Sequence, residues 1–342
     1  MRTRRRPGPH PQQRWSRPLA LGAACLLVAA LAACSGDEQQ DVTIGLITKQ
    51  ETNPFWVAMK NDALDAAEDH DVELVTATGS SDVDVESQVE AIRRMTADGV
   101  DGILVAPTDS RALVPAIEEA RAAGIVVVAL DTPTDPTSAV DAVFATDNER
   151  AGALVGGYAR EKVAQLGIEP RVALLDLAPG IASGELRRQG FLSGFGIDAD
   201  DPVISGAVDT EGDEDLARVA MRELLAEDPG INVVYTVNER AALGAIAVMR
   251  DAGIDMAQVV VVSIDGGCAA MKSAVRPGDL DATAQQYPEN MAAQGVRQIA
   301  EAVRGGDLPS GYLDTGVTLV TRYPVPGVTS ENVAFGVRNC WG

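Results

Sequence analysis

The sequence predicts an α/β protein with two lobes, each built on a doubly wound parallel sheet. Short apolar runs alternate along the chain with amphipathic stretches of about 10–15 residues, the pattern of strands joined by crossover helices. The alternation occurs in two successive series of similar length. The 342 residues are 46% apolar and 23% charged, which allows packed cores and one large or two ordinary domains.

The first series runs from Val42 to Ala145. Its expected strands are 42–47, 72–77, 102–106, 125–130 and 142–145, and its expected helices are 55–70, 85–97 and 111–123. The fourth of these strands is almost wholly β-branched, as is typical of a strand buried on both faces. Asn53 followed by Pro54 is a favourable start for the first helix.

The second series begins near Thr146-Asp147-Asn148. Its expected strands are 172–177, 203–208, 233–237 and 259–264, and its expected helices are 150–165, 184–195, 216–227, 241–252 and 288–304. In open sheets of this kind, ligands bind beyond the carboxyl ends of the strands. Two such lobes facing each other would place these ends across a cleft, which is a preferred place for a small ligand.

The segment 1–33 has the features of a secretory signal. Six arginines precede an apolar run, Leu19–Ala33, that is shorter than the roughly 20 residues of a spanning helix. The sequence Leu31-Ala32-Ala33-Cys34 resembles the bacterial lipobox, in which the cysteine receives diacylglyceride and becomes the new N-terminus. An ordinary signal peptide that happens to contain a cysteine is the alternative. We therefore expect a lipidated tether at 34–41 and an extracytoplasmic protein anchored to the cell membrane.

The net charge excludes some partners and the histidine count excludes some sites. The chain has a net charge of −22, and loss of the basic signal would make it more negative, so nucleic-acid binding is disfavoured. Its only histidines, His10 and His70, rule out a multi-histidine metal site. The acidic stretch Asp209–Asp215 lacks the complete calcium-loop pattern and fits a solvated loop before a helix. We predict no metal and no cofactor.

Two cysteines remain in the second half of the chain, Cys268 and Cys340. An even pair in an exported protein predicts a disulfide, although two buried free thiols are the alternative. The bond would close a long loop and contribute about 3–4 kcal/mol in the chain-entropy model.

Polar and aromatic side chains follow several expected strands. They include Asn53, Phe55 and Trp56 after the first strand, and Asp131, Asn238, Asp265 and Gln286 after later ones. Carboxylates and amides hydrogen-bond vicinal hydroxyls, and an aromatic face stacks on a sugar ring, so the set fits a neutral polyol. Helix capping is the alternative for each Asp or Asn taken alone.

Seven short segments, in their order and spacing, carry a family resemblance. They are 52–56 (Thr-Asn-Pro-Phe-Trp), 106–110 (Ala-Pro-Thr-Asp-Ser), 130–133 (Leu-Asp-Thr-Pro), 145–148 (Ala-Thr-Asp-Asn), 238–239 (Asn-Glu), 263–267 (Ser-Ile-Asp-Gly-Gly) and 285–288 (Gln-Gln-Tyr-Pro). From Asp41 to Gly342 the chain resembles the substrate-binding lipoproteins of bacterial sugar ABC importers. These belong to the ribose-binding branch of the type I periplasmic-binding-protein fold.

The resemblance implies a set of ligand-binding residues. The Asn of the Asn-Pro-Phe-aromatic motif bonds sugar hydroxyls, and its two aromatics stack on the ring. Thr132 stands where ribose binders have Arg, and Glu185 occupies the place of a second Arg, while Arg187 nearby either serves the structure or reaches the cleft. The expected ligand-binding residues are Asn53, Phe55, Trp56, Asp131, Thr132, Glu185, Arg187, Asn238, Asp265 and Gln286.

The resemblance also implies a mechanism and a subgroup. Asp131–Pro133, Asp265–Cys268, Gln285–Pro288, Asp314–Val317 and the terminal Asn-Cys-Trp-Gly look most like the fructose-binding branch. The implied protein is a monomer that captures a monosaccharide, fructose or a relative, by lobe closure and delivers it to an ABC permease. The family's three-segment hinge predicts crossings near Thr146, Tyr287 and Gly316. The lobes would then be 42–146 with 287–316, and 147–286 with 317–342.

Three other functions compete with import. A sensory receptor for a chemotaxis or kinase partner would use the same binding fold. An enzyme with Asp131 and Asp265 as an acid–base pair is disfavoured, because the chain has no GxSxG, P-loop or HExxH motif and no GxGxxG after the first strand. A sugar-responsive repressor would need a helix-turn-helix where the signal stands.

Overall fold

The structure is a computed structural model that describes residues 41–342. The predicted signal at 1–33 and the predicted lipid acceptor, Cys34, lie outside the described residues. Within 41–342, no helix is both long enough and apolar enough to cross a membrane.

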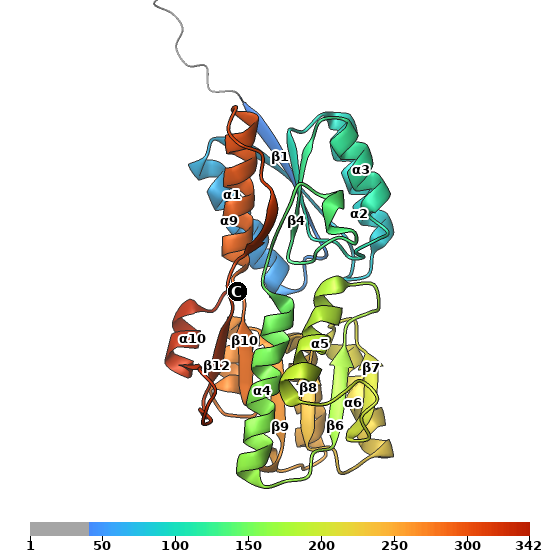
Figure 1. Cartoon of the computed structure of the whole chain (residues 1–342), viewed down its shortest axis with the longest axis vertical. Coiled ribbons are helices and arrows are strands. Elements are labelled where there is room, and N and C mark those ends of the chain that lie inside the picture. Colours follow the sequence, from blue (N-terminus) through green and yellow to red (C-terminus); the bar gives the residue numbers. More distant parts are fainter. Residues whose placement is uncertain (1–40) are drawn as a thin grey trace, which may run out of the picture. The chain divides into compact units, whose positions relative to one another are not determined.

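The first sheet has six parallel strands in the order β11-β5-β4-β3-β1-β2. Their bounds are β1 (Val42–Thr48), β2 (Val72–Thr78), β3 (Gly102–Val105), β4 (Val126–Leu130), β5 (Ala142–Ala145) and β11 (Gly311–Asp314). Helices α1 (Pro54–Asp69) and α9 (Pro288–Val303) cover one face, and α2 (Val85–Asp98) and α3 (Val114–Ala122) cover the other (Figure 1).

The second sheet has seven strands in the order β13-β12-β10-β9-β8-β6-β7. All neighbouring strands pair in parallel except β10 and β12, which are antiparallel. Their bounds are β6 (Val172–Asp176), β7 (Ile204–Asp209), β8 (Val233–Thr236), β9 (Val260–Asp265), β10 (Ala282–Gln285), β12 (Thr318–Thr321) and β13 (Glu331–Asn332). Helices α4 (Asn148–Leu166) and α5 (Ala182–Phe195) cover one face. The other face carries α6 (Glu214–Glu227), α7 (Glu239–Asp251), α8 (Cys268–Ala270) with a π-helical turn to Val275, and α10 (Val333–Asn339).

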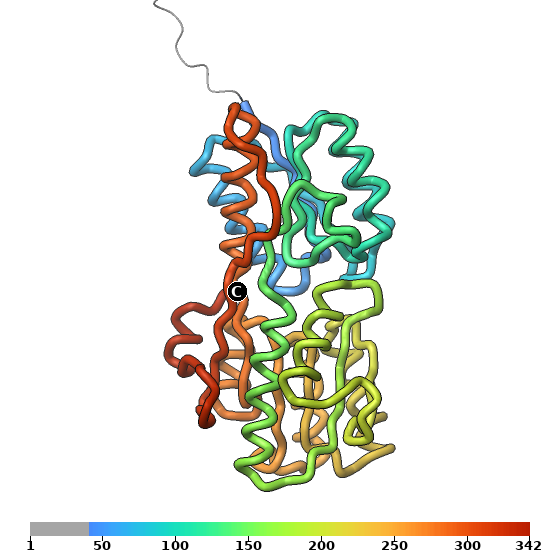
Figure 2. Tube along the Cα trace, in the orientation of Figure 1, coloured from blue at the N-terminus to red at the C-terminus, as the bar shows by residue number. Residues whose placement is uncertain are grey.

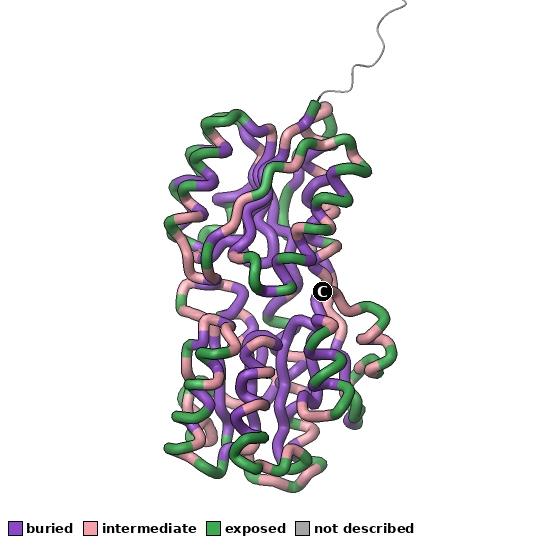
Figure 3. The backbone as a smooth tube through the Cα atoms, turned by 180° about the vertical axis from the view of Figure 1, so that it is seen from behind, coloured by how far each residue is buried: buried purple, intermediate pink, exposed green. Residues whose placement is uncertain are grey.

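Each sheet lies between two apolar layers. In β1, Ile44 and Leu46 pack toward α1 and α9, whereas Ile47 packs toward α2 and α3. Side chains alternate between the faces of a strand, so a strand that is apolar throughout supplies both layers. The buried residues follow the strands and the inner sides of the helices, while exposed residues gather on outer helix turns and loops (Figure 3).

The chain passes three times between the two sheets (Figure 2). The passages join β5 to α4, β10 to α9 and β11 to β12. Two parallel-sheet lobes joined by three segments are the architecture expected from the sequence, and the predicted fold class is confirmed.

The longer predicted elements match the structure to within a few residues. The helix expected at 111–123 begins only at Val114, because Arg111–Leu113 form a turn. Strands β10–β13 and helices α8 and α10 were not predicted. The two helices have three and seven residues, too few to show a helical period, and none of these strands is a continuous apolar run like the equally short β3.

Helices α4 and α5 approach each other closely because glycines line their contact. A Cβ atom at Gly152 would overlap the carbonyl oxygen of Arg187, and one at Gly190 would overlap that of Glu149. Gly156 and Gly194 are crowded in the same way. The contact fixes the position of Arg187 relative to the amino-terminal end of α4, where Asn148 lies.

Candidate functional site

A small cavity lies at the carboxyl ends of the strands of both sheets. It has about 340 Å³ of space between atoms, its open mouth included. It is lined by Lys49, Asn53, Phe55, Trp56, Asp82, Asp131, Leu177, Ser183, Arg187, Asn238, Asp265 and Gln286. The part of this space that is free for a water-sized sphere is about 30 Å³, well below the roughly 300–1,000 Å³ of small-molecule sites, so the side chains of the site nearly fill it. The position is the one that an open parallel sheet predicts.

Eight of the ten residues expected to bind ligand line this cavity, and two do not. Thr132 is fully buried just behind it, where its hydroxyl donates to Asp131 Oδ2 (2.8 Å) and lies 2.9 Å from Ser183 Oγ. Glu185 lies outside the cavity, and its carboxylate accepts a hydrogen bond from the Gly180 amide (3.0 Å). Thr132 therefore orients a cavity carboxylate, and Glu185 holds the loop before α5.

Arg187, rather than Glu185, brings a charge from α5 into the cavity. Its guanidinium donates to Asn148 Oδ1 (2.7 Å) and to the carbonyl oxygen of Val237 (3.1 Å). It also lies 3.7 Å from Asp131 and 3.5 Å from Asp265. The side chain is almost fully buried, so these contacts are what compensates its charge. It therefore has both of the roles considered for it from the sequence.

The two aromatic residues are packed edge to face. The Phe55 and Trp56 ring centroids are 4.7 Å apart with planes at 88°. The indole Nε1 of Trp56 donates to Asp82 Oδ1 (2.9 Å), and the Lys49 ammonium lies 5.3 Å from the indole centroid. These contacts fix the orientation of the Trp56 ring at the cavity wall.

The two cavity asparagines cap helices as well as lining the site. Asn53 Oδ1 accepts from the Phe55 amide (3.0 Å) at the start of α1, which leaves its Nδ2 available to a ligand. Asn238 Oδ1 accepts from Ala241 N (2.9 Å) at the start of α7, while its Nδ2 donates to Gly212 O (3.0 Å). Capping and cavity lining are therefore compatible at these positions.

Two of the three cavity aspartates, Asp131 and Asp265, have unusual backbone conformations and cap no helix. Asp131 has φ of 63° and Asp265 has φ of 137°, values that L-residues seldom adopt. Both side chains are nearly buried. Asp265 Oδ1 accepts a hydrogen bond from Gln286 Nε2 (2.7 Å). Both of these aspartates therefore have a strained backbone that the surrounding structure must hold in place. Such strain is typical of functional sites.

Burial shifts the protonation of the charged groups. Desolvation raises the pKa of Asp265 to about 7 against the opposing effect of Arg187, with a further increase from Asp131. Desolvation also raises the pKa of Asp82, although Lys49 lowers it, and desolvation lowers the pKa of Lys49. Behind Asp265, the buried Glu239 has its pKa raised to about 8, first by desolvation and then by Asp265. Among the lining residues, Asp265 therefore has the carboxylate whose pKa lies near neutral pH.

Four lining residues were not predicted: Lys49, Asp82, Leu177 and Ser183. Lys49 and Leu177 directly follow β1 and β6, so the strand-end rule applied to every strand would have found them. Ser183 lies in the first turn of α5. Asp82 lies in the loop between β2 and α2, and hydrogen bonds from Trp56 and Gln50 hold it at the site.

The acidic stretch Asp209–Asp215 forms a capped helix start, as expected. Asp213 Oδ1 accepts from the amides of Asp215 and Leu216 at the beginning of α6. Among residues 41–342, no group of three or more His, Cys, Asp or Glu side chains is arranged to hold a metal ion.

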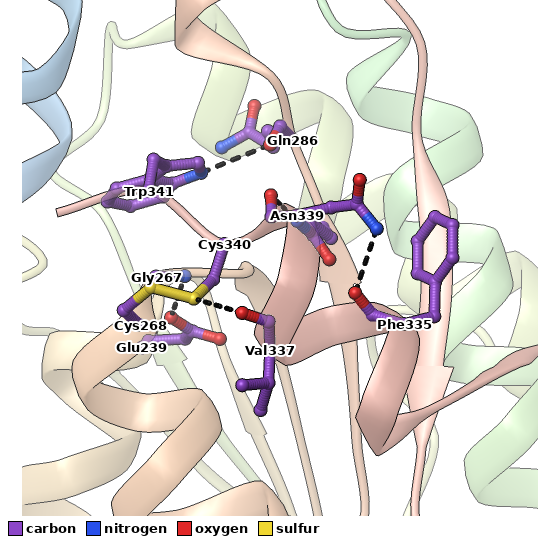
Figure 4. The surroundings of a disulfide bond; sticks show 10 residues. Glu239, Gly267, Cys268, Gln286, Phe335, Val337, Asn339, Cys340 and Trp341 are labelled. Atoms are coloured by element: carbon purple, nitrogen blue, oxygen red, sulfur yellow. Dashed lines mark hydrogen bonds between the residues drawn. A yellow bond between two sulfur atoms is a disulfide. The ribbon is translucent and has the colours of Figure 1, made fainter.

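The predicted disulfide is present between Cys268 and Cys340, with Cα atoms 4.9 Å apart (Figure 4). Cys268 begins α8, three residues after Asp265, and Cys340 follows α10. The bond therefore ties the C-terminus to the strand end that carries a cavity carboxylate.

Comparisons with known proteins agree with this geometry. The model of a family described as "Periplasmic binding protein domain" matches residues 44–307. A D-ribose/D-allose-binding protein of Pseudomonas aeruginosa is 29% identical over 309 residues, which are 87% of this chain and 94% of the relative. A D-allose-binding periplasmic protein of Escherichia coli is 30% identical over 267 residues, 76% of this chain and 84% of the relative.

A solved structure of a solute-binding protein is also similar to this chain. An ABC transporter solute-binding protein of Agrobacterium vitis, with bound D-fucose, superposes with a TM-score of 0.76 at 25% identity. The match covers 88% of this chain and all of the other. These are binding proteins, and the prediction that the chain is a binding protein and not an enzyme is confirmed. Because the family model and the relatives extend over most of its length, the chain belongs to the periplasmic binding protein domain family.

Proposed function

We propose that the protein captures a monosaccharide, fructose or a close relative, by closure of two lobes and delivers it to an ABC permease. The lobes are 42–146 with 287–316, and 147–286 with 317–342. Cys34 carries the lipid that anchors the protein, as a monomer, on the extracytoplasmic side of the membrane.

The observation that carries this proposal is the composition of the cavity. Carboxylates of Asp131 and Asp265 accept from hydroxyls, while Asn53 and Arg187 donate, and Phe55 and Trp56 supply aromatic surface. Gln286 Oε1 is buried without a hydrogen-bond partner. A buried unpaired acceptor costs about 1–3 kcal/mol, so a ligand hydroxyl that donates to it would be favoured. Alternating donors and acceptors around an aromatic wall suit a polyhydroxylated ring.

Contacts between the lobes support the closure step. The Ser110 amide donates to Gly180 O (3.0 Å), and Ser110 Oγ accepts from the Ala182 amide (3.1 Å). The Thr132 and Ser183 hydroxyls meet beside the cavity. Such contacts exist only when the lobes are together, and a ligand that contacts both lobes would add to them.

The relatives favour a sugar, and the chain's own segments favour a ketose. The names of the relatives include ribose and allose, and the structural neighbour holds fucose. Thr132 and Glu185 stand where ribose binders have arginines, and Glu185 points away from the site, so Arg187 is the only arginine lining the described cavity. A pocket with fewer cationic donors than the ribose binders is consistent with a different monosaccharide.

The proposal is tested by thermal unfolding of the protein with a panel of D-fructose, D-tagatose, D-ribose, D-allose and D-fucose. A ligand at 100 times its Kd should stabilise the protein by about 2.7 kcal/mol. We expect the largest shift with fructose or a near relative. Asp265→Ala should abolish the shift, and Glu119→Ala, at an exposed carboxylate paired with Arg93, should preserve it. No response to any ketose, aldose or polyol would reject sugar binding, and a response to ribose alone would reject the fructose assignment.

A further inference from the structure

The last three residues, Cys340–Gly342, are fixed to the half of the molecule that contains the second sheet. Cys340 is bonded to Cys268, and the Cys268 amide donates to the carbonyl oxygen of Trp341 (2.9 Å). Trp341 also pairs with Gly267 in a parallel β-bridge. A covalent bond and a backbone bridge hold this segment, called here the C-terminal clasp, against Cys268 and Gly267 (Figure 4). These two residues closely follow Asp265 in the chain.

The Trp341 side chain reaches residues of the ligand cavity. Its Nε1 donates to the carbonyl oxygen of Gln286 (3.1 Å), as Figure 4 shows. Its ring meets Phe55 edge to face, with centroids 5.2 Å apart and planes at 78°. Phe55 belongs to α1, which packs on the first sheet. The clasp is therefore anchored on one lobe and contacts a cavity aromatic of the other.

Two further contacts support a bridging position. Gly342 lies against Pro54, directly before Phe55 in α1. A second hollow, partly walled by Trp341 and Gly342, shares Asn53 and Asp265 with the ligand cavity. The indole therefore stands beside the ligand cavity, against the Phe55 ring that lines it.

We propose that Trp341 is a positioning residue that orients Phe55 and favours the closed arrangement of the lobes, with the disulfide as its anchor. The inference rests on the proposed sugar capture. The contact between Trp341 and Phe55 joins a group on one lobe to a group on the other, so it is lost when the lobes separate. An interaction present in only one of two states shifts the population toward that state. Ligand release is then slowed by a contact that the ligand itself does not make.

The test measures equilibrium affinity and dissociation rate for the sugar that gives the largest thermal shift. Trp341→Ala should raise Kd about tenfold, equivalent to about 1.4 kcal/mol, mainly through faster dissociation. Trp341→Phe keeps a ring against Phe55 and should recover most of the affinity. Tyr323→Ala is the matched control, because it removes an aromatic ring that lies against Lys162 and Arg322. It should lower the unfolding temperature of the ligand-free protein without changing Kd.

The double variant Cys268→Ser/Cys340→Ser releases the anchor while leaving Trp341 in place. It should raise Kd and the dissociation rate in the same direction as Trp341→Ala. If Trp341→Ala and Tyr323→Ala lower the unfolding temperature equally and both keep the parental Kd, Trp341 is merely structural and the clasp is rejected while sugar capture stands. If the parent protein binds no sugar, both proposals fall.

Discussion

Asp265 combines three features that act on one carboxylate. Its backbone is strained, its side chain is buried, and its pKa is raised to about 7 by desolvation despite Arg187. Its pKa is also raised by the charges of Asp131 and Asp82 and lowered by the hydrogen bond from Gln286. Asp265 in turn raises the pKa of Glu239. An ionised carboxylate only accepts hydrogen bonds, whereas the protonated form loses part of this acceptor capacity.

Ligand affinity should therefore depend on pH through Asp265. Below a pKa of about 7 the proton competes with the ligand, and affinity should fall by up to about tenfold per pH unit. Asp265→Asn should bind weakly and show little of this dependence. Titration calorimetry between pH 5.5 and 8.5 measures both. Asp176→Asn, a change outside the cavity, should keep the parental profile, and an identical profile in Asp265→Asn would refute the assignment.

Arg187 is the cation that compensates two buried carboxylates from different strand ends. Its contacts to Asp131 and Asp265 are longer than direct hydrogen bonds, whereas those to Asn148 and Val237 are short. Removing one member of a buried charge cluster leaves the others without compensation, which is the costly case for buried ions.

We expect Arg187→Met to lower the free energy of unfolding by about 3–5 kcal/mol at pH 8. The loss should be smaller at pH 5, where Asp265 is protonated. Urea denaturation at the two pH values measures the difference. Arg111→Met breaks an exposed ion pair with Asp135 and should cost no more than about 1 kcal/mol. Equal losses in the two variants would show that burial of Arg187 has no special importance.

At the scale of the elements, the contact between α4 and α5 decides where Arg187 lies. Gly152 has no room for a side chain because the carbonyl oxygen of Arg187 occupies that space. Gly157, on the same helix, has open space where a Cβ would stand. Gly152 and Gly157 thus differ in packing but share their intrinsic helix propensity.

Gly152→Ala should destabilise the protein by about 1–3 kcal/mol through overpacking and should weaken ligand binding, because α5 and Arg187 must move. Gly157→Ala should be neutral or stabilise by about 0.5–1 kcal/mol, since alanine is the better helix former. Thermal unfolding and ligand titration of the two variants make the comparison. A gain in stability for both would contradict the close helix contact.

At the scale of the whole molecule, buried acids are spread over the half with the second sheet. Desolvation raises the pKa of Asp176 to about 6, of Asp281 to about 7 and of Glu239 to about 8, as it does for Asp265. Between the unfolded pKa values near 4 and these folded values, the native state binds more protons than the unfolded state. Stability from these groups is present at low pH and is lost as pH rises through the folded pKa values.

The ligand-free protein should consequently unfold at a higher temperature near pH 5 than near pH 8. Calorimetry across this range measures the slope, which depends on the difference in bound protons. Asp281→Asn should flatten the curve, because it removes one of the titrating groups. The opposite slope, with greater stability at pH 8, would show that these carboxylates are ionised at little cost.

The sequence identified residues that line the described cavity where local chain features determine their position. Asn53, Asp131 and Asp265 were found because they follow strands that are long and apolar enough to recognise. Asp82 was missed although it lies four residues after the end of β2, because its place at the cavity depends on hydrogen bonds from Trp56 and Gln50 in the loop and helix after β1.

Glu185 and Arg187 show the limit of matching positions along a helix. Two residues along an α-helix turn a side chain by about 200°, so these two face opposite sides of α5 and only one reaches the cavity. Which one does so depends on how α5 packs against α4. The glycines of this contact, Gly152 and Gly156 on α4 and Gly190 and Gly194 on α5, are spaced four residues apart, but that spacing does not say which helix each pair meets. Short elements such as α10, which carries the clasp, were missed for a related reason, since seven residues do not define a period.

The three passages of the chain between the sheets set the order in which the molecule can be completed during synthesis. The layer of side chains from α1 lacks its partners Met291, Val296 and Ile299 until α9 has emerged. Strand β11, at the edge of the first sheet, and strand β12, beside β10 in the second sheet, come later still. Each half therefore lacks part of its core until these late segments have been synthesised. We expect stable structure to form only when almost the entire chain is available to fold.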